Sequence, residues 1–119
     1  MNISAYQSWL EAYDRERGFE RVQPSQTLVH ALEEMGEIAR EVLYLEGYRE
    51  PDDLEGRRAL LAAELADCLT FLFKLAYQFD IDMEAALIAN QDKANARFPV
   101  EVGRELAARY RARQQGRLG

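Results

Sequence analysis

The chain has 119 residues, of which 48% are hydrophobic and 30% are charged, and its formal net charge is −6. This acidic balance argues against a sequence-independent grip on DNA or RNA, which needs a basic surface, and the apolar runs are far shorter than the ~20 residues of a membrane span. A single cysteine, Cys68, excludes an internal disulfide, and the N-terminus lacks the pattern of a secretory signal. We therefore expect a cytoplasmic protein without nucleic-acid or membrane partners.

Helical periodicity dominates the chain, because no segment alternates with a period of two and β-branched residues are sparse. Gly18 and Pro99 mark two helix ends, and a polar loop around Pro51 marks another. Ser25 and Asp82 are suitable N-caps for the helices that follow them. Five helices are therefore expected, over about residues 3–16, 25–46, 55–79, 82–98 and 100–114.

Long helices joined by short loops, each with one apolar face, pack as antiparallel bundles. We therefore predict an all-α, antiparallel four- to five-helix bundle formed by a single domain over residues 1–119, in which residues 100–119 make a C-terminal helix and tail. A domain of this length can bury a core, but it is small for a binding cleft of its own.

Two pairs of acids recur at a spacing of three residues, Glu34-x-x-Glu37 in the second predicted helix and Glu64-x-x-Asp67 in the third. This spacing places both members of a pair on one helical face, and antiparallel packing can bring the two pairs to the same level of the bundle. Burying like charges without a partner costs several kcal/mol. The four carboxylates therefore predict a bound cation.

Two other interpretations of these acids stay open: they are ordinary surface residues, or buried arginines neutralise them. The surface interpretation explains the second pair poorly, because its helix is apolar at nearly every other position. Among metals, one histidine, His30, and one cysteine are too few for a di-iron or a structural zinc site. An all-oxygen set suits Mg²⁺, with Mn²⁺ as a possible substitute.

The blocks ALEEMGEIAREVLYLEGYRE and LAAELADCLTFLFKLAYQFDIDMEAALIANQDKANARFPVE closely resemble the MazG-like all-α nucleoside triphosphate pyrophosphohydrolases. The family pattern is E-E-x-x-E on one helix and E-x-x-D on the next, followed by a helix that ends in a segment with Lys, Asn and Arg. In this chain the pattern reads Glu33-Glu34-Met35-Gly36-Glu37, then Glu64-Leu65-Ala66-Asp67, then Asn90 to Arg97. The resemblance covers about residues 25–100, the expected core of the domain.

The resemblance implies Mg²⁺-dependent hydrolysis of a nucleoside triphosphate to the monophosphate and pyrophosphate. It assigns the metal to Glu34, Glu37, Glu64 and Asp67. It also gives Glu33 a catalytic role, either in orienting or deprotonating the attacking water or only in adding charge beside the ligands. Similar proteins complete the pocket with a neighbouring subunit, so we expect a homodimer or a dimer of dimers.

Substrate contacts are expected outside the acid motifs. Asn90, Lys93 and Arg97 fall on one face of the fourth helix and can meet the phosphates, with Asn95 as the alternative to Asn90. Without such a role, the two bases are ordinary solvated side chains. The candidates for contact with the nucleobase are His30, Trp9 and Phe19, although aromatic residues at helical spacing more often belong to a core.

Rival functions fit the same motifs. A phosphoribosyl-ATP pyrophosphatase and a pyrimidine-specific dCTPase or dUTPase share the motif architecture. The rival from a different class is an inactive, metal-stabilised helical interaction module. The complete set of acids disfavours this last alternative, because a degenerate site would be expected to lose at least one ligand.

Overall fold

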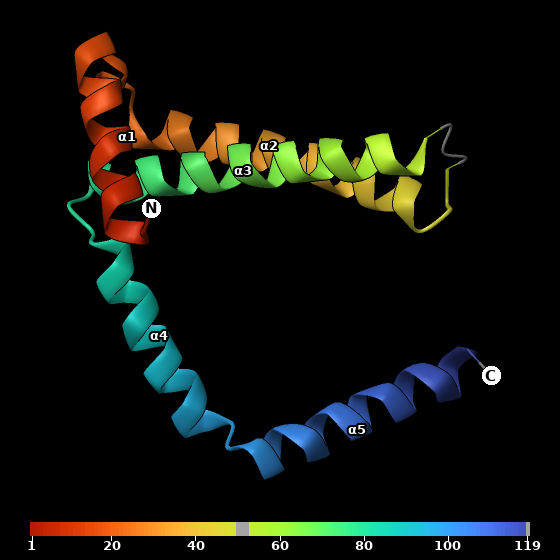
Figure 1. Ribbon diagram of the computed structural model, residues 1–119. Coiled ribbons are helices and arrows are strands. Elements are labelled where there is room, and N and C mark those ends of the chain that lie inside the picture. The colour runs from red at the N-terminus through yellow and green to blue at the C-terminus, as the bar shows by residue number, and fades with distance from the viewer. Residues whose placement is uncertain (50–52, 119) are drawn as a thin grey trace. The chain divides into compact units, whose positions relative to one another are not determined.

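Helices account for nearly all of the computed structural model, which describes residues 1–49 and 53–118 (Figure 1). Within these ranges there are five α-helices, one short 3-10 helix and no strand, so the predicted all-α class is confirmed. The elements follow the chain as α1 (Ile3–Arg17), η1 (Phe19–Arg21), α2 (Pro24–Leu45), α3 (Leu54–Gln78), α4 (Met83–Arg97) and α5 (Val100–Leu118).

The chain divides into two compact units, Met1–Met83 and Glu84–Gly119. The first unit contains the acid motifs and the second contains most of α4 and all of α5. Pro51, which the sequence places in a loop between α2 and α3, lies outside the described residues. No helix in the described part of the chain is both long and apolar enough to cross a membrane.

Helix ends in the first unit follow local backbone chemistry. Gly18 closes α1 in the left-handed conformation, with a φ of 78°, as its sequence position predicts. The prediction that Ser25 caps α2 is wrong, because Gln23 is the N-cap residue and Pro24 occupies the first turn. Proline suits that position, since its φ is already helical and its missing N–H would have no partner there.

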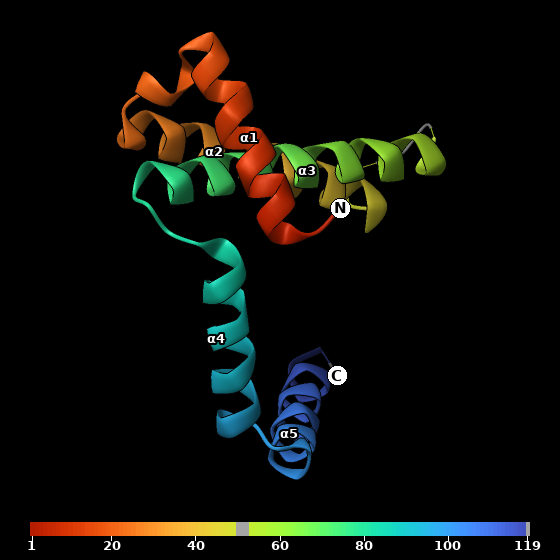
Figure 2. The same ribbon diagram turned by 60° about the vertical axis from the view of Figure 1, so that its left-hand side comes forward.

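Helices α2 and α3 lie side by side and antiparallel in both views (Figures 1 and 2). Small side chains let them approach, since Ala31 and Cys68 are both buried and the Cys68 Sγ lies 3.9 Å from the carbonyl oxygen of Ala31. A part-buried ion pair adds to this contact, because the guanidinium of Arg57 donates to both carboxylate oxygens of Glu41 at 3.2 and 3.3 Å. The pair links the C-terminal part of α2 to the N-terminal part of α3.

Helix α1 packs across α3 through an apolar cluster of Leu10, Phe73 and Tyr77. A polar contact accompanies this cluster. The Asp14 side chain is fully buried and accepts hydrogen bonds from the Tyr77 hydroxyl at 2.5 Å and the Lys74 ammonium at 3.1 Å. Since a buried carboxylate needs such partners, this contact fixes α1 on α3.

The second unit consists of two helices separated at Pro99, as the sequence predicts. Helix α5 extends to Leu118, beyond the expected end near residue 114. None of the described side chains in α4 is buried. The prediction of a single domain over residues 1–119 stays a prediction.

Candidate metal centre and adjoining pocket

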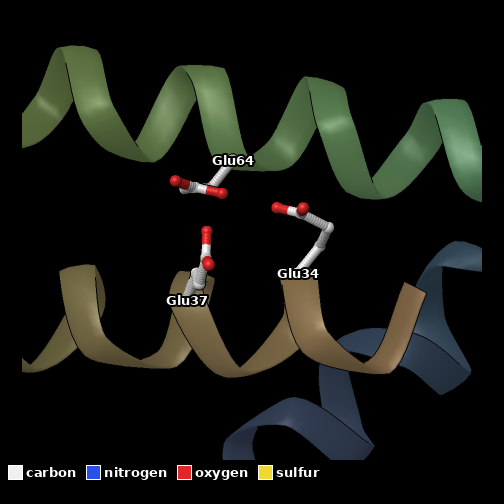
Figure 3. Close-up of side chains that lie close together, drawn as sticks. All are labelled: Glu34, Glu37 and Glu64. Atoms are coloured by element: carbon white, nitrogen blue, oxygen red, sulfur yellow. The ribbon is translucent and has the colours of Figure 1, made fainter. Parts of the chain in front are cut away.

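Three carboxylates converge between α2 and α3 (Figure 3). Glu34 and Glu37 extend from successive turns of α2, and Glu64 faces them from α3. One carboxylate oxygen from each residue lies within 4.8 Å of the other two, and all three side chains are half-buried. We call these residues the acid cluster.

The acid cluster is electrostatically strained, since like charges raise each other's pKa. A hydrogen bond shared with Glu34 raises the pKa of Glu64, and burial and the negative charges of Glu34 and Asp67 raise it further, while a hydrogen bond with Glu37 lowers it. The pKa of Glu37 is raised by its hydrogen bond with Glu64 and by that neighbour's charge, with a small opposing effect from Arg40. The cluster therefore favours a shared proton or a cation.

Two carboxylate oxygens in the acid cluster have unmet hydrogen-bonding capacity. Among the described residues, Glu34 Oε2 and Glu64 Oε2 are buried and have no hydrogen-bond partner. The half-buried bases of α3 have acid partners outside the cluster, since Arg57 donates to Glu41 and Lys74 to Asp14. Buried carboxylate oxygens that lack a donor fit a hard divalent cation such as Mg²⁺, which binds oxygen ligands. The cluster's donor set thus suits the metal predicted from the sequence.

Two further predicted site residues lie beside the acid cluster. Asp67, one helical turn after Glu64, is exposed and outside the 4.8 Å group, but its charge contributes to the raised pKa values of Glu37 and Glu64. Glu33 is also exposed, and its carboxylate lies 3.7 Å from His30 Nδ1. A metal-binding role for Asp67 and a catalytic role for Glu33 both stay predictions.

A pocket of about 220 Å³ lies along the α2–α3 pair, and His30 in its lining is one helical turn before Glu34. The His30 ring stacks on the Phe71 ring, with centroids 5.4 Å apart and an interplanar angle of 22°. The lining of the pocket includes Phe19, Thr27, His30, Phe71, Lys74 and Gln78. We call this the aromatic pocket.

The aromatic pocket contains two of the three residues predicted to contact a nucleobase. Phe19 and His30 both line it. Trp9 does not: it packs against the rings of Tyr6 and Tyr13 on α1, at centroid distances of 5.8 and 5.2 Å. A base-binding role for these residues stays a prediction.

Sequence reasoning missed Phe71 and Lys74 as pocket residues, although two signals could have indicated them. Phe71 lies four residues after Asp67, which places it on the same helical face as that acid. Lys74 is the only basic residue between Glu64 and the end of α3, in an otherwise apolar segment. A lone cation in such a segment needs a partner, but the partner, Asp14, is 60 positions away in the sequence.

The predicted phosphate contacts lie on α4. Asn90, Lys93 and Arg97 all have exposed side chains, and their spacing places them on one helical face. The Arg97 guanidinium lies 5.2 Å from the centroid of the Phe98 ring. Contact between these side chains and phosphate stays a prediction.

Comparison with known proteins independently supports the resemblance to nucleotide pyrophosphohydrolases. Among the proteins similar to this chain are nucleotide pyrophosphatases. It is 33% identical to dCTP pyrophosphatase 1 of Rattus norvegicus over 107 residues, which are 87% of this chain and 62% of that protein. It is 31% identical to dCTP pyrophosphatase 1 of Bos taurus over 103 residues, 80% of this chain and 58% of that protein. The motif-based resemblance to nucleotide pyrophosphohydrolases is thereby confirmed.

The length of the match differs among relatives. The chain spans about three fifths of the two dCTP pyrophosphatases, 62% and 58%. It spans 97% of the uncharacterised protein YvdC of Bacillus subtilis, with 29% identity over 103 residues. No family model matches the chain.

Proposed function

We propose that this protein is a Mg²⁺-dependent nucleoside triphosphate pyrophosphohydrolase, which releases a nucleoside monophosphate and pyrophosphate. The observation that carries the proposal is the acid cluster, in which Glu34, Glu37 and Glu64 converge and two buried oxygens have no hydrogen-bond partner among the described residues. Similarity to dCTP pyrophosphatases over most of the chain supports the same activity. Cys68, buried and free, supports a cytoplasmic location.

The chemistry follows from charge. A triphosphate would be repelled by the acid cluster alone, so the cluster binds substrate only through divalent cations. Mg²⁺ bound there would polarise phosphoryl oxygens and lower the pKa of a bound water. Glu34, Glu37 and Glu64 would hold the metal, with Asp67 as a further ligand. Glu33 would orient the attacking water.

The remaining substrate groups have their own proposed contacts. Lys93 and Arg97 can donate to phosphate oxygens, Arg97 in the bidentate manner of a guanidinium, and Asn90 lies on the same face of α4. Phe19 and His30 would bind the nucleobase in the aromatic pocket. The names of the relatives make dCTP the first substrate to test.

The spacing of the two sites supports binding of a single nucleotide. On α2, His30 precedes Glu34 by four residues, or about 6 Å of helical rise, and on α3, Phe71 follows Glu64 by seven, or about 10 Å. The aromatic pocket and the acid cluster thus follow one another along the same pair of helices. A base in the pocket can therefore present its phosphates to the cluster through the sugar.

Release of pyrophosphate from a panel of ribo- and deoxyribonucleoside triphosphates tests the proposal. We expect cleavage with Mg²⁺ and none with EDTA. Glu64→Ala should lower kcat/KM at least ~100-fold, because even groups that only orient metal ligands contribute 10- to 100-fold. Glu55→Ala, at an exposed acid in the first turn of α3, is the matched control and should retain activity. An inactive protein whose melting temperature rises with Mg²⁺ would instead be a metal-stabilised interaction module.

We further propose that the protein acts as a homodimer or homotetramer. Large apolar side chains are exposed on both helices that carry the acid cluster, including Leu32 and Met35 on α2 and Leu65 on α3. Exposed apolar side chains that gather on one region of a monomer are typical of interaction surfaces. A second copy could also add contacts to the substrate site, which one chain leaves half-open.

A further inference from the structure

The segment between α3 and α4 has a defined backbone conformation at its α3 end. The Ile81 N–H donates to the carbonyl oxygen of Ala76 at 2.9 Å, and the Asp80 N–H donates to that of Tyr77 at 3.1 Å. Asp80 has a φ of 55°, in the left-handed region that aspartate tolerates better than most residues. Together these features form a Schellman motif, which satisfies carbonyl groups at the end of a helix.

A side chain of α1 holds the same segment at its α4 end. Gln7 donates from Nε2 to the carbonyl oxygen of Ile81 at 2.6 Å, and its Oε1 accepts from the N–H of Met83 at 3.0 Å. Met83 is the first residue of α4, so its N–H has no partner within the helix. The Met83 side chain also packs against the apolar cluster between α1 and α3. Both polar groups of the Gln7 amide thus bind the segment that leads into α4.

The conformation of this segment matters because the predicted phosphate contacts lie far along α4. Lys93 and Arg97 follow Met83 by ten and fourteen residues, or about 15 and 21 Å of helical rise. A swing of about 20° at the first turn would displace Lys93 by about 5 Å. A misplacement of only about 1 Å can lower a rate about 100-fold. None of the described side chains in α4 is buried, so little packing along the helix opposes such a swing.

We propose that Gln7 is a positioning residue for the triphosphate: by binding Ile81 and Met83, it limits the swing of α4 and so places Lys93 and Arg97 for contact with the phosphates. This inference rests on the proposed function and adds to it a residue of α1 that touches no substrate. The two hydrogen bonds of the Gln7 amide are the contacts that carry it.

A double-mutant cycle tests the assignment, with kcat/KM measured on the triphosphate that the substrate panel shows to be cleaved best. Gln7→Met keeps the length of the side chain but removes both hydrogen bonds, and it should lower kcat/KM about 10-fold. In a Lys93→Met background the same change should cost less than about 3-fold, because the contact that Gln7 serves is already lost. Changes at independent sites would instead multiply.

Two further variants control the cycle. Gln26→Met, at an exposed glutamine of α2, should leave kcat/KM unchanged in both backgrounds. Gln7→Glu keeps an acceptor for the Met83 N–H and loses only the donor to Ile81, which covers the case in which Gln7→Met does not fold. Its loss of kcat/KM should depend on Lys93 in the same way.

The outcomes separate the two proposals. Equal fold-losses in both backgrounds would overturn the inference, because they would show that Gln7 supports the fold without acting through Lys93. Unchanged kcat/KM in Gln7→Met or in Lys93→Met would overturn it too, and in each of these cases the proposed hydrolysis would stand. A wild-type protein that cleaves no triphosphate would overturn both.

Discussion

In the acid cluster, the pKa of a carboxylate depends on the charges of its neighbours. Glu34, Glu37 and Glu64 are ordinary glutamates by sequence, but their convergence raises the pKa of Glu37 and of Glu64. In contrast, Glu41 is more deeply buried and is stabilised by Arg57. The difference lies in the partner, since a buried acid next to a base is balanced and a buried acid next to other acids is not.

The stability of the metal-free protein should depend on pH through this cluster. A carboxyl whose pKa is raised by folding stabilises the fold below the usual carboxyl pKa of about 4.3 and loses that contribution as pH rises through the raised value. Glu37 and Glu64 both have raised pKa values. The melting temperature of metal-free Glu64→Gln should therefore fall less, or rise more, than that of the wild type between pH 4 and pH 7.

Mg²⁺ should reverse the relative effect of pH 7 on the melting temperatures of the wild type and Glu64→Gln. With the metal bound, the ionised wild-type cluster becomes the favourable state, so Mg²⁺ should raise the melting temperature of the wild type more than that of Glu64→Gln at pH 7. Glu55→Gln, at an exposed position of the same helix, is the control for loss of a carboxylate. If the melting temperatures of the wild type and Glu64→Gln, measured in EDTA, changed identically with pH, the predicted repulsion among the carboxylates would be contradicted.

Helices were predictable from the sequence because their signals are local. Apolar periodicity, Gly18 and Pro99 gave five helices in the right order. The N-cap of α2 was predicted wrongly because two local preferences compete there: a serine hydroxyl suits an N-cap, but the preceding proline suits the first turn, and the proline sets the start.

Two glycines should respond to alanine in opposite directions. Gly18 has a φ of 78°, so Gly18→Ala should destabilise the protein by about 1 kcal/mol through backbone strain alone, since an added Cβ meets nothing within 4 Å. Gly36 lies inside α2 with equally open surroundings, so Gly36→Ala should stabilise the protein by about 1 kcal/mol. Urea unfolding of the metal-free protein measures both. A loss of stability in Gly36→Ala would contradict the prediction.

The site was predictable only in part, because some of its residues are close together in the sequence and others are far apart. The acid cluster follows from residues three apart on two neighbouring helices, and the structure brings three of the four predicted ligands within 4.8 Å. The charge balance in the aromatic pocket depends on Asp14 and Lys74, which no local pattern pairs. Trp9, which the sequence offered as a contact for the nucleobase, lies outside the pocket and packs against the rings of Tyr6 and Tyr13 on α1.

At the scale of the whole molecule, the exposed apolar side chains predict self-association. Light scattering coupled to size-exclusion chromatography should show a dimer or tetramer. Leu32→Glu should shift it toward the monomer, because Leu32 is 62% exposed on α2 and a charge buried at an interface costs several kcal/mol. Gln26→Glu adds the same charge at an exposed polar position of α2 and should leave the assembly intact. A monomeric wild-type protein would contradict the prediction.

Helix α1 contributes no metal ligand, yet shortening the chain at its N-terminal end would change what the neighbouring site can attract. Without Asp14, the Lys74 ammonium in the aromatic pocket would lose the carboxylate that balances its charge. Such a truncated protein would draw anions of any kind toward a pocket that is electrically balanced in the intact chain. Helix α1 thus controls the charge of the pocket through Asp14, although it touches neither the metal nor the phosphates in our proposal.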